Sequence, residues 1–282
     1  MAEAEVASTL YDAITPEIEA EVPPRSTLAE TPTVSIEVPG RLVQPRISVV
    51  IPALNEAQNL PHVLCKLPAC VSEVILVDGG SNDGTVEAFQ ELLPGAIVVH
   101  QTGRGKGNAL AAGFQAATGD IVVMLDCDGS ADPGEIPKFV EVLTGGADFA
   151  KGTRFGHGGS SADITRFRGL GNAALVWLVN LLYRTDYTDL CYGMNAFWRH
   201  CLPYMNPDCD GFEVETLINI RIARAGLRVE EVGSHEARRL YGFSKLHTMR
   251  DGWRVLRTII AEFGPRRVEL EANTLVATEH DD

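Results

Sequence analysis

The sequence has few basic residues and no long hydrophobic run. Its 282 residues include 24 Lys and Arg against 38 Asp and Glu, so the formal net charge is −14. Such an acidic chain lacks the basic surface that nucleic-acid backbones require, which argues against a nucleic-acid partner. No apolar stretch reaches the roughly 18 residues of a membrane-spanning helix. The acidic N-terminus also lacks the apolar segment of a signal peptide.

Cysteine is present but carries no metal or redox motif. None of the six cysteines belongs to a CxxC pair, and most stand beside apolar residues. These features are typical of reduced cysteines in a cytoplasmic protein. Together with the missing membrane span, they predict a cytoplasmic location, with contact to a membrane only at its surface.

The composition changes near residue 46. Residues 1–45 contain six prolines, and eight acidic residues against two arginines. This predicts a disordered, acidic and Pro-rich arm. Residues 46–264 form the predicted domain, and residues 265–282 form a predicted acidic tail. With hydrophobic residues at 45% of the chain, one sizeable core can be buried.

Apolar strands alternate with helical patterns in the first half of the domain. Runs rich in Val, Ile and Leu are typical of buried parallel strands, and the alternation predicts an α/β fold with a mostly parallel central sheet. The predicted strands are 47–53, 73–80, 96–101, 120–126, 147–156 and 227–233. The predicted helices are 56–67, 83–93, 106–118, 169–183, 211–226 and 248–263.

Polar residues follow each of the first strands. In open α/β sheets, ligands bind beyond the carboxyl ends of the strands, so these side chains should converge on one crevice. They are Asn55 and Glu56, Asp78, the glycine-rich segment 103–107, and Asp126 with Asp128.

The pair Asp126 and Asp128 is the strongest single signal. Two carboxylates at the end of a buried strand suit a hard divalent cation, Mg²⁺ or Mn²⁺, which completes its shell with substrate phosphates. An EF-hand is excluded because Ala131 and Pro137 stand where that loop needs Gly and Glu.

The segment GRGKGN (103–108) matches no dinucleotide or P-loop fingerprint. Asn108 stands where GxGxxG needs its last glycine, and the GxxxxGK spacing is absent. The segment remains a candidate for a flexible loop that brings Arg104 and Lys106 near a diphosphate.

Taken together and in order, the motifs resemble those of family 2 glycosyltransferases with the GT-A (Rossmann-like) fold. The resemblance is to the dolichyl- and polyprenyl-phosphate mannose synthases and glucosyltransferases, and it covers about residues 46–260. The motifs that carry it are PALNE (52–56), DGGSNDGT (78–85), the segment 103–108, DCD (126–128), GTRF (152–155), GFEVET (211–216) and RLYGFSKL (239–246).

The resemblance implies roles for individual residues. Asp128 and Asp126 would hold the metal, and Asp128, Arg239, Lys245 and Glu213 would form the catalytic set. Nucleotide-sugar binding would involve Pro52, Asn55, Glu56, Asp78, Lys106, Asp126 and Arg154. Asp78 can accept a hydrogen bond from a nucleobase ring N–H. The side chains of Arg154, Arg239 and Lys245 suit phosphate oxygens.

Three positions depart from the family pattern. Gly79 stands where a second acid is frequent, Ser130 stands where the mannose synthases have Gln, and YGMN (192–195) replaces SGFR. The last two changes leave the third metal ligand and the acceptor open.

The resemblance implies a metal-dependent inverting transfer of a hexose from GDP-mannose or UDP-glucose to a polyprenyl phosphate. A phosphate acceptor needs no strong base, whereas an alcohol does, and Glu213, Glu215 or Asp189 could serve a soluble hydroxyl acceptor. An inactive nucleotide-sugar-binding protein is a third alternative. A pyrophosphorylase is disfavoured because PALNE stands where its glycine-rich loop should be.

The apolar segment 164–184 has two interpretations. Flanked by Arg166, Arg168 and Arg184, it could lie in a membrane interface beside a lipid acceptor. The other interpretation is a core or subunit-interface helix, and the oligomeric state is left open.

Overall fold

The computed structural model of the chain describes residues 36–38 and 41–264. The chain divides into the units Met1–Glu30 and Thr31–Asp282, and every described residue belongs to the second. Within the predicted arm, the short strands β1 (Ile36–Val38) and β2 (Arg41–Val43) pair antiparallel. The rest of the arm up to residue 35, and the predicted tail 265–282, lie outside the described residues.

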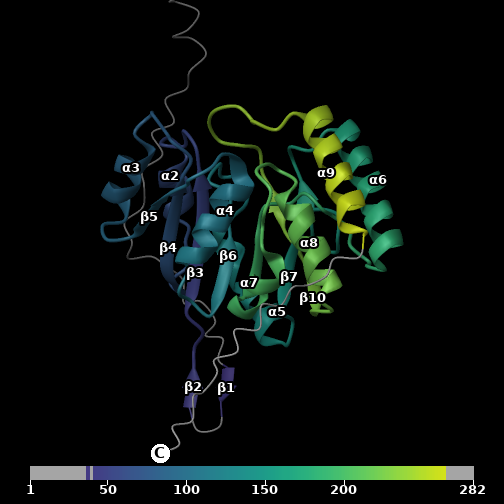
Figure 1. Ribbon diagram of the computed structural model, residues 1–282. Helices are drawn as coiled ribbons and strands as arrows, with labels where there is room; N and C mark the ends of the chain where they lie inside the picture. Colours follow the sequence, from purple (N-terminus) through teal and green to yellow (C-terminus); the bar gives the residue numbers. More distant parts are fainter. Residues whose placement is uncertain (1–35, 39–40, 265–282) are drawn as a thin grey trace, which may run out of the picture. The chain divides into compact units, whose positions relative to one another are not determined.

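A seven-stranded sheet forms the centre of the domain (Figure 1). Its order is β10-β7-β9-β6-β3-β4-β5, and β9 alone among these seven pairs antiparallel with its neighbours. The other six strands therefore run in one direction, as the alternating sequence pattern predicts. The strands are β3 (Ile47–Ala53), β4 (Val71–Asp78), β5 (Ile97–His100), β6 (Ile121–Met124), β7 (Phe149–Thr153), β9 (Asn195–Trp198) and β10 (Val229–Gly233).

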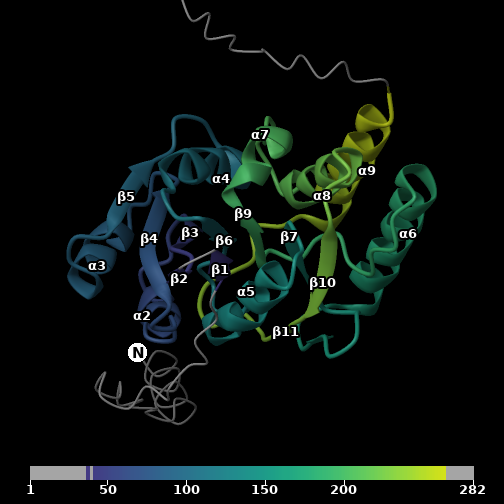
Figure 2. The same ribbon diagram turned by 90° about the horizontal axis from the view of Figure 1, so that it is seen from below.

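Helices cover both faces of the sheet, because both faces of each strand are apolar. Val49 and Ile51 pack against one set of helices, and the intervening Val50 packs against the other. Figure 2 shows the two layers on either side of the sheet. The first comprises α2 (Leu60–Leu64), α3 (Thr85–Leu92) and α5 (Ile136–Thr144), and the second α4 (Gly105–Ala116), α7 (Leu202–Met205) and α8 (Val214–Arg224).

Two further helices, α6 (Arg166–Tyr183) and α9 (Thr248–Glu262), pack against each other and against α8. Val179 and Ile259 are fully buried in the apolar cluster that these helices share. The Tyr183 hydroxyl also donates a hydrogen bond to the Ile259 carbonyl at 2.6 Å. Among the described helices, none combines the length and hydropathy that a bilayer crossing needs.

Several elements differ from the sequence-based expectation. The helix predicted over 56–67 is only α2, because backbone N–H groups at its predicted start bond to Thr85 and Asp83 side chains instead. Strand β9 was not predicted, since four residues are too few to show a period. The two-residue strands β8 (Ser160–Ser161) and β11 (His235–Glu236), which pair parallel, were also missed.

Candidate active site

Polar side chains gather at the carboxyl edge of the sheet. The loops after β3, β4, β6, β7 and β10 all leave the sheet at this edge, because those strands share one direction. The structure therefore supports the convergence that the strand ends predict.

The loops after β3 and β4 are joined by side-chain hydrogen bonds. Asn55 adopts a left-handed backbone with φ of 56°, which Asn tolerates better than most residues. Its amide N–H donates to the Ser81 hydroxyl at 2.9 Å, and its side-chain oxygen accepts from the Asn82 N–H at 2.9 Å. The neighbouring Pro52 lies on β3, paired with Val77. These bonds tie the PALNE loop to the turn that follows β4.

Asp78 lies at the end of β4 and organises the turn that follows. Its carboxylate accepts hydrogen bonds from the backbone N–H groups of Gly80 (3.1 Å) and Ser81 (3.0 Å). Burial opposes its ionisation, but these bonds and that of His100 hold the pKa of Asp78 below its usual value. A carboxylate has about four acceptor sites, so a nucleobase contact stays compatible with this turn.

Asp128 faces a cation from the far end of the chain. One carboxylate oxygen accepts from the Ser130 N–H at 3.0 Å, and the other lies 3.1 Å from Nη1 of Arg239. The same guanidinium hydrogen-bonds to the buried carboxylate of Glu56. The structure thus brings together three residues that the motifs predict, from positions more than 180 residues apart.

The loop of residues 237–247, here called the RLYGFSKL loop, is attached to the site at several points. The Leu240 N–H donates to the Asp128 carbonyl at 3.2 Å, and the Tyr241 N–H donates to the Asn59 side chain at 3.0 Å. Lys245 donates to the Leu54 carbonyl and lies 3.9 Å from Glu56. Burial and the nearby Arg239 lower the pKa of Lys245, although Glu56 opposes the shift.

Asp126 faces a second cation, Lys106. The ammonium nitrogen lies 2.5 Å from Asp126 and 2.6 Å from Glu215, a buried residue on α8. Burial disfavours the charge of Lys106, but the two carboxylates raise its pKa above the usual value. Burial and the nearby Asp126 raise the pKa of Glu215, and the positive charge of Lys106 partly offsets this rise. Lys106 therefore links α8 to the loop that carries Asp126.

The segment YGMN presses its glycine against Asp126. A Cβ built on Gly193 would lie 2.0 Å from an Asp126 carboxylate oxygen and 3.0 Å from the Lys106 nitrogen. The glycine-rich segment 103–108 makes a similar close approach, since a Cβ on Gly107 would lie 2.0 Å from the Cys209 carbonyl. Both glycines are therefore needed for backbone approach beside the site.

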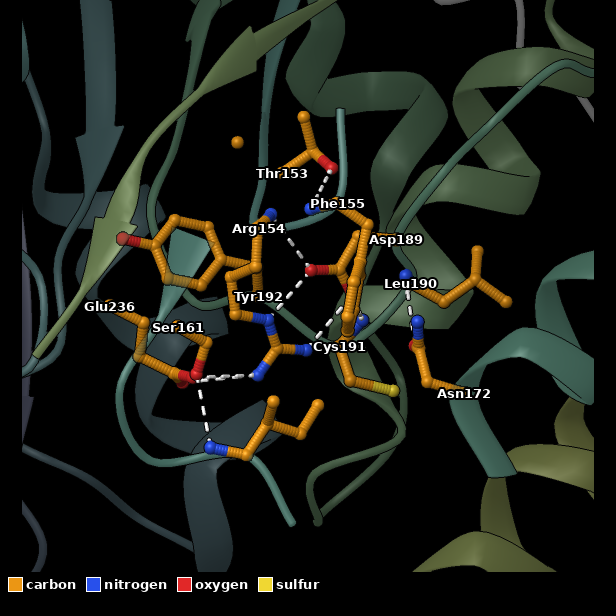
Figure 3. Close-up of polar contacts among 12 residues, drawn as sticks. Thr153, Arg154, Phe155, Ser161, Asn172, Asp189, Leu190, Cys191, Tyr192 and Glu236 are labelled. Carbon is orange, nitrogen blue, oxygen red and sulfur yellow. Dashed lines mark hydrogen bonds and ion pairs between the residues drawn. The ribbon is translucent and has the colours of Figure 1, made fainter. Parts of the chain in front are cut away.

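Arg154 is engaged by carboxylates rather than aimed at Asp126 and Asp128. Its guanidinium donates two hydrogen bonds to Asp189, at 2.7 and 2.9 Å, and others to Glu236 at 3.0 and 3.2 Å (Figure 3). Both Arg154 and Asp189 are buried. A role for Arg154 at the donor phosphates stays a prediction, and its observed partners show a structural role.

Glu213 and Glu215 point in different directions, as their spacing on a helix predicts. Glu213 lies at the N-cap of α8, where one oxygen accepts from the Gly211 N–H at 3.3 Å and lies 3.9 Å from Arg254. Its other oxygen is buried without a hydrogen-bond partner among the described residues. Glu215, not Glu213, joins the Asp126 cluster, so a catalytic role for Glu213 remains a prediction.

The donor set fits a divalent cation shared with phosphates. No group of three or more His, Cys, Asp or Glu side chains within residues 36–38 and 41–264 is arranged to hold a metal by itself. Asp126 and Asp128 nonetheless offer hard oxygen ligands, and each already faces a cationic group. Mg²⁺ and Mn²⁺ are commonly held by one or two carboxylates plus substrate oxygens, so Asp126 and Asp128 suffice as the protein's share.

Sequence reasoning missed one of these residues and left the roles of two others open. Glu236 was missed because the two-residue strand that carries it has no sequence signature. Gly193 was noticed only as a departure from the family pattern. Glu215 was considered, but spacing alone cannot say which of two acids on a helix faces inward.

Comparisons with known proteins show the family to which the chain belongs. Residues 48–205 match the family model "Glycosyl transferase family 2", which covers more than half of the chain. The chain therefore belongs to glycosyltransferase family 2, and it is a glycosyltransferase with the GT-A fold.

Two curated relatives and one solved structure illustrate the family. Glycosyltransferase AglJ of Haloferax volcanii is 31% identical over 66% of this chain and 61% of its own length. The dolichol-phosphate mannosyltransferase of Pyrococcus furiosus is 30% identical over 71% of this chain and 59% of its own length. The matches thus span about three fifths of these relatives.

The solved structure is glucosyl-3-phosphoglycerate synthase from Mycobacterium tuberculosis, in complex with Mn²⁺, uridine diphosphate and phosphoglyceric acid. It shares 25% sequence identity with a TM-score of 0.63, and the match covers 79% of this chain and 80% of that one.

Proposed function

We propose that this glycosyltransferase moves a hexose from a nucleotide sugar, GDP-mannose or UDP-glucose, to a polyprenyl phosphate, with inversion and with Mg²⁺ or Mn²⁺ as cofactor. The observation that carries the proposal is the meeting of Asp126 and Asp128 with Lys106 and Arg239 at the carboxyl edge of the sheet. Carboxylates for a cation and cations for phosphates lie there side by side.

The departing nucleoside diphosphate is the group that this site would stabilise. Asp126 and Asp128 would hold the divalent cation, which offsets the negative charge that develops on the leaving group. Arg239 and Lys245 would bind phosphate oxygens once the donor is present. Asp78 and Asn55, held by the joined loops, would orient the nucleoside.

The state of the carboxylates supports a phosphate acceptor. An alcohol needs a general base, whereas a phosphate is already anionic. Of the acids at the edge, Glu56, Asp126, Asp128 and Glu215 each contact Lys or Arg, so their oxygens already have cationic partners. The relative named dolichol-phosphate mannosyltransferase points the same way.

A second candidate is transfer to a soluble hydroxyl acceptor that also carries an anionic group. The solved relative was crystallised with phosphoglyceric acid, a small acceptor of this kind. The candidate base is Glu213, whose second carboxylate oxygen has no hydrogen-bond partner among the residues that the structure describes. Loss of transfer to a soluble acceptor in Glu213→Gln, with transfer to a lipid phosphate absent in the wild type, would favour this alternative.

The test measures transfer from a panel of nucleotide sugars to a detergent-dispersed polyprenyl phosphate, with and without Mn²⁺. We expect Asp128→Ala to lower the rate by about 10²–10³, since one transition-state contact of this kind is lost. Asp132→Ala is the matched control: this acid lies in the same loop but only caps the Gly134 N–H at 3.1 Å. Full activity of Asp128→Ala in EDTA would refute the metal-dependent mechanism.

A further inference from the structure

The exposed large apolar residues of this protein are concentrated at one place. Among the described residues, fifteen such side chains are exposed, and eleven of them lie on α6, on α9 with its C-cap, and in the RLYGFSKL loop. Scattered exposed apolar residues are ordinary, but such a concentration marks an interaction site. We name the helical part the α6–α9 surface; its apolar members are Phe167, Leu170, Trp177, Leu181, Met249, Trp253, Ile260 and Phe263.

Each helix contributes one exposed stripe. Phe167, Leu170, Trp177 and Leu181 recur at steps of three, seven and four residues, which places them on one face of α6. The opposite face carries Val176 and Val179, which are buried in the core. This explains why the α6 sequence is apolar nearly all round: one side packs inward and the other stays exposed. Trp177 is 65% exposed and Trp253, on α9, is 69% exposed.

The charges on the α6–α9 surface are of one sign. The exposed charged residues of α6, its C-cap and α9 are all arginines: Arg166, Arg184, Arg250, Arg254 and Arg257. The two acids of α9, Asp251 and Glu262, are buried. The acids nearest to α6 in sequence, Asp163 and Asp186, stand beyond its ends. In a chain of net charge −14 this surface is a local reversal of sign.

We infer that the α6–α9 surface docks on an anionic lipid bilayer. Apolar and aromatic groups ringed by arginines fit the interface of such a membrane. A second copy of this chain fits poorly, because a two-fold contact through this surface would set arginines against arginines. The biological reason for membrane docking rests on the proposed lipid acceptor. The experiment that tests docking does not depend on that proposal.

The surface is continuous with the active site through the RLYGFSKL loop. That loop runs from Arg239, on Asp128, to His247, the N-cap of α9 (Figure 1). Phe243, between them, is 92% exposed. Docking by α6 and α9 (Figure 2) would bring this loop to the headgroup region, where a prenyl phosphate presents its phosphate.

The test is cosedimentation of the full chain with vesicles at low salt. We expect binding to phosphatidylcholine mixed with phosphatidylglycerol and much weaker binding to phosphatidylcholine alone. Arg166→Gln and Arg257→Gln should each weaken binding about fivefold, the usual effect of one basic residue at such a surface. Arg199→Gln, an exposed arginine after β9, is the matched control and should change nothing.

Two of the three tryptophans lie on this surface, so fluorescence gives a second readout. Vesicles should shift the emission to the blue, and Trp177→Glu with Trp253→Glu should abolish cosedimentation. Leu92→Glu places the same charge at an exposed apolar site on α3 and should leave binding intact. Circular dichroism checks that each variant is folded.

Three outcomes overturn the inference. They are absence of binding to anionic vesicles, equal loss in Leu92→Glu, or a stable dimer by light scattering that Trp177→Glu dissociates. Transfer to detergent-dispersed prenyl phosphate by a protein that ignores vesicles would overturn the membrane surface and leave the proposed function standing. Vesicle binding without such transfer would overturn the proposed function and leave the membrane-docking surface standing.

Discussion

Gly193 controls the position of Asp126 by having no side chain. Gly193→Ala would push a methyl group to within 2.0 Å of the Asp126 carboxylate, so that carboxylate or the backbone must shift. A displacement of about 1 Å at a catalytic group can cost ~10² in rate, and we expect a loss of that order in transfer assays. Gly252→Ala, where nothing lies within 4 Å of the new methyl, is the control and should stay active. Normal activity of Gly193→Ala would show that Asp126 need not be held there.

The Arg154–Asp189 pair makes a different prediction, about stability. Asp189→Asn removes one charge of a buried pair and should lower the free energy of unfolding by about 3–5 kcal/mol, measured by urea titration. Asp163→Asn makes the same change in the exposed pair with Arg168 (3.2 Å) and should cost at most about 1 kcal/mol. Equal effects of the two substitutions would argue against a structural role for Arg154.

The same pair predicts a pH dependence. Burial opposes ionisation of Asp189, but Arg154 holds its pKa below the usual value in the folded protein. As the pH falls below about 4, the ordinary Asp pKa, the unfolded chain therefore takes up the proton first. The contribution to stability is complete above that pH and is lost as the pH falls toward the folded-state pKa. The difference in unfolding free energy between wild type and Asp189→Asn should shrink over this range, and a constant difference would refute the assignment.

At the scale of elements, the RLYGFSKL loop is the part that should respond to ligands. Its residues 240–245 are exposed, Gly242 has φ of 77°, and its attachment relies on Arg239 and Lys245. Donor phosphates and a divalent cation would compete for these same groups. Elements with few buried contacts open at low free-energy cost.

We therefore expect trypsin to cleave more slowly at Arg238, Arg239 and Lys245 once nucleotide sugar and Mn²⁺ are bound. Mass spectrometry of timed digests gives the rates, and cleavage after the exposed Arg199 serves as an internal reference. In Asp128→Ala the ligand-dependent protection should be absent. Unchanged rates in wild type, with donor binding confirmed by calorimetry, would contradict the loop's role.

At the scale of the whole molecule, β9 joins the two halves of the sheet. It lies between β6 and β7, and its Phe197 stacks on Phe149 (ring centroids 5.6 Å apart) and meets Phe114 edge-on (5.3 Å). Phe197→Ala should lower the free energy of unfolding by about 3–5 kcal/mol in denaturant titrations. Leu92→Ala, at an exposed position on α3, should stay within about 0.5 kcal/mol of the wild type. A small effect of Phe197→Ala would mean that the halves are joined by other contacts.

The sequence by itself determined the fold class and the family, and it placed two carboxylates directly after a buried strand. Buried parallel strands are continuous apolar runs, so the strands at residues 47–53 and 121–124 can be predicted from the sequence. The polar residues after them must meet because parallel strands end at one edge. The location of Asp126 and Asp128 at this edge can be predicted for the same reason, since it depends only on the strand before them.

Only the tertiary structure decided which distant groups pair. Arg239 reaches Asp128, and Glu215 reaches Lys106, across separations that no local period encodes. It also separated the two faces of α6, whose sequence is apolar on both, because burial depends on what packs against a helix and not on the helix alone. Arg154 is a second case in which the tertiary structure decides the partner. Its motif predicts contact with a phosphate, but the fold surrounds it with Asp189 and Glu236. A charge is matched by whatever the packed chain places beside it, and that is a property of the whole fold.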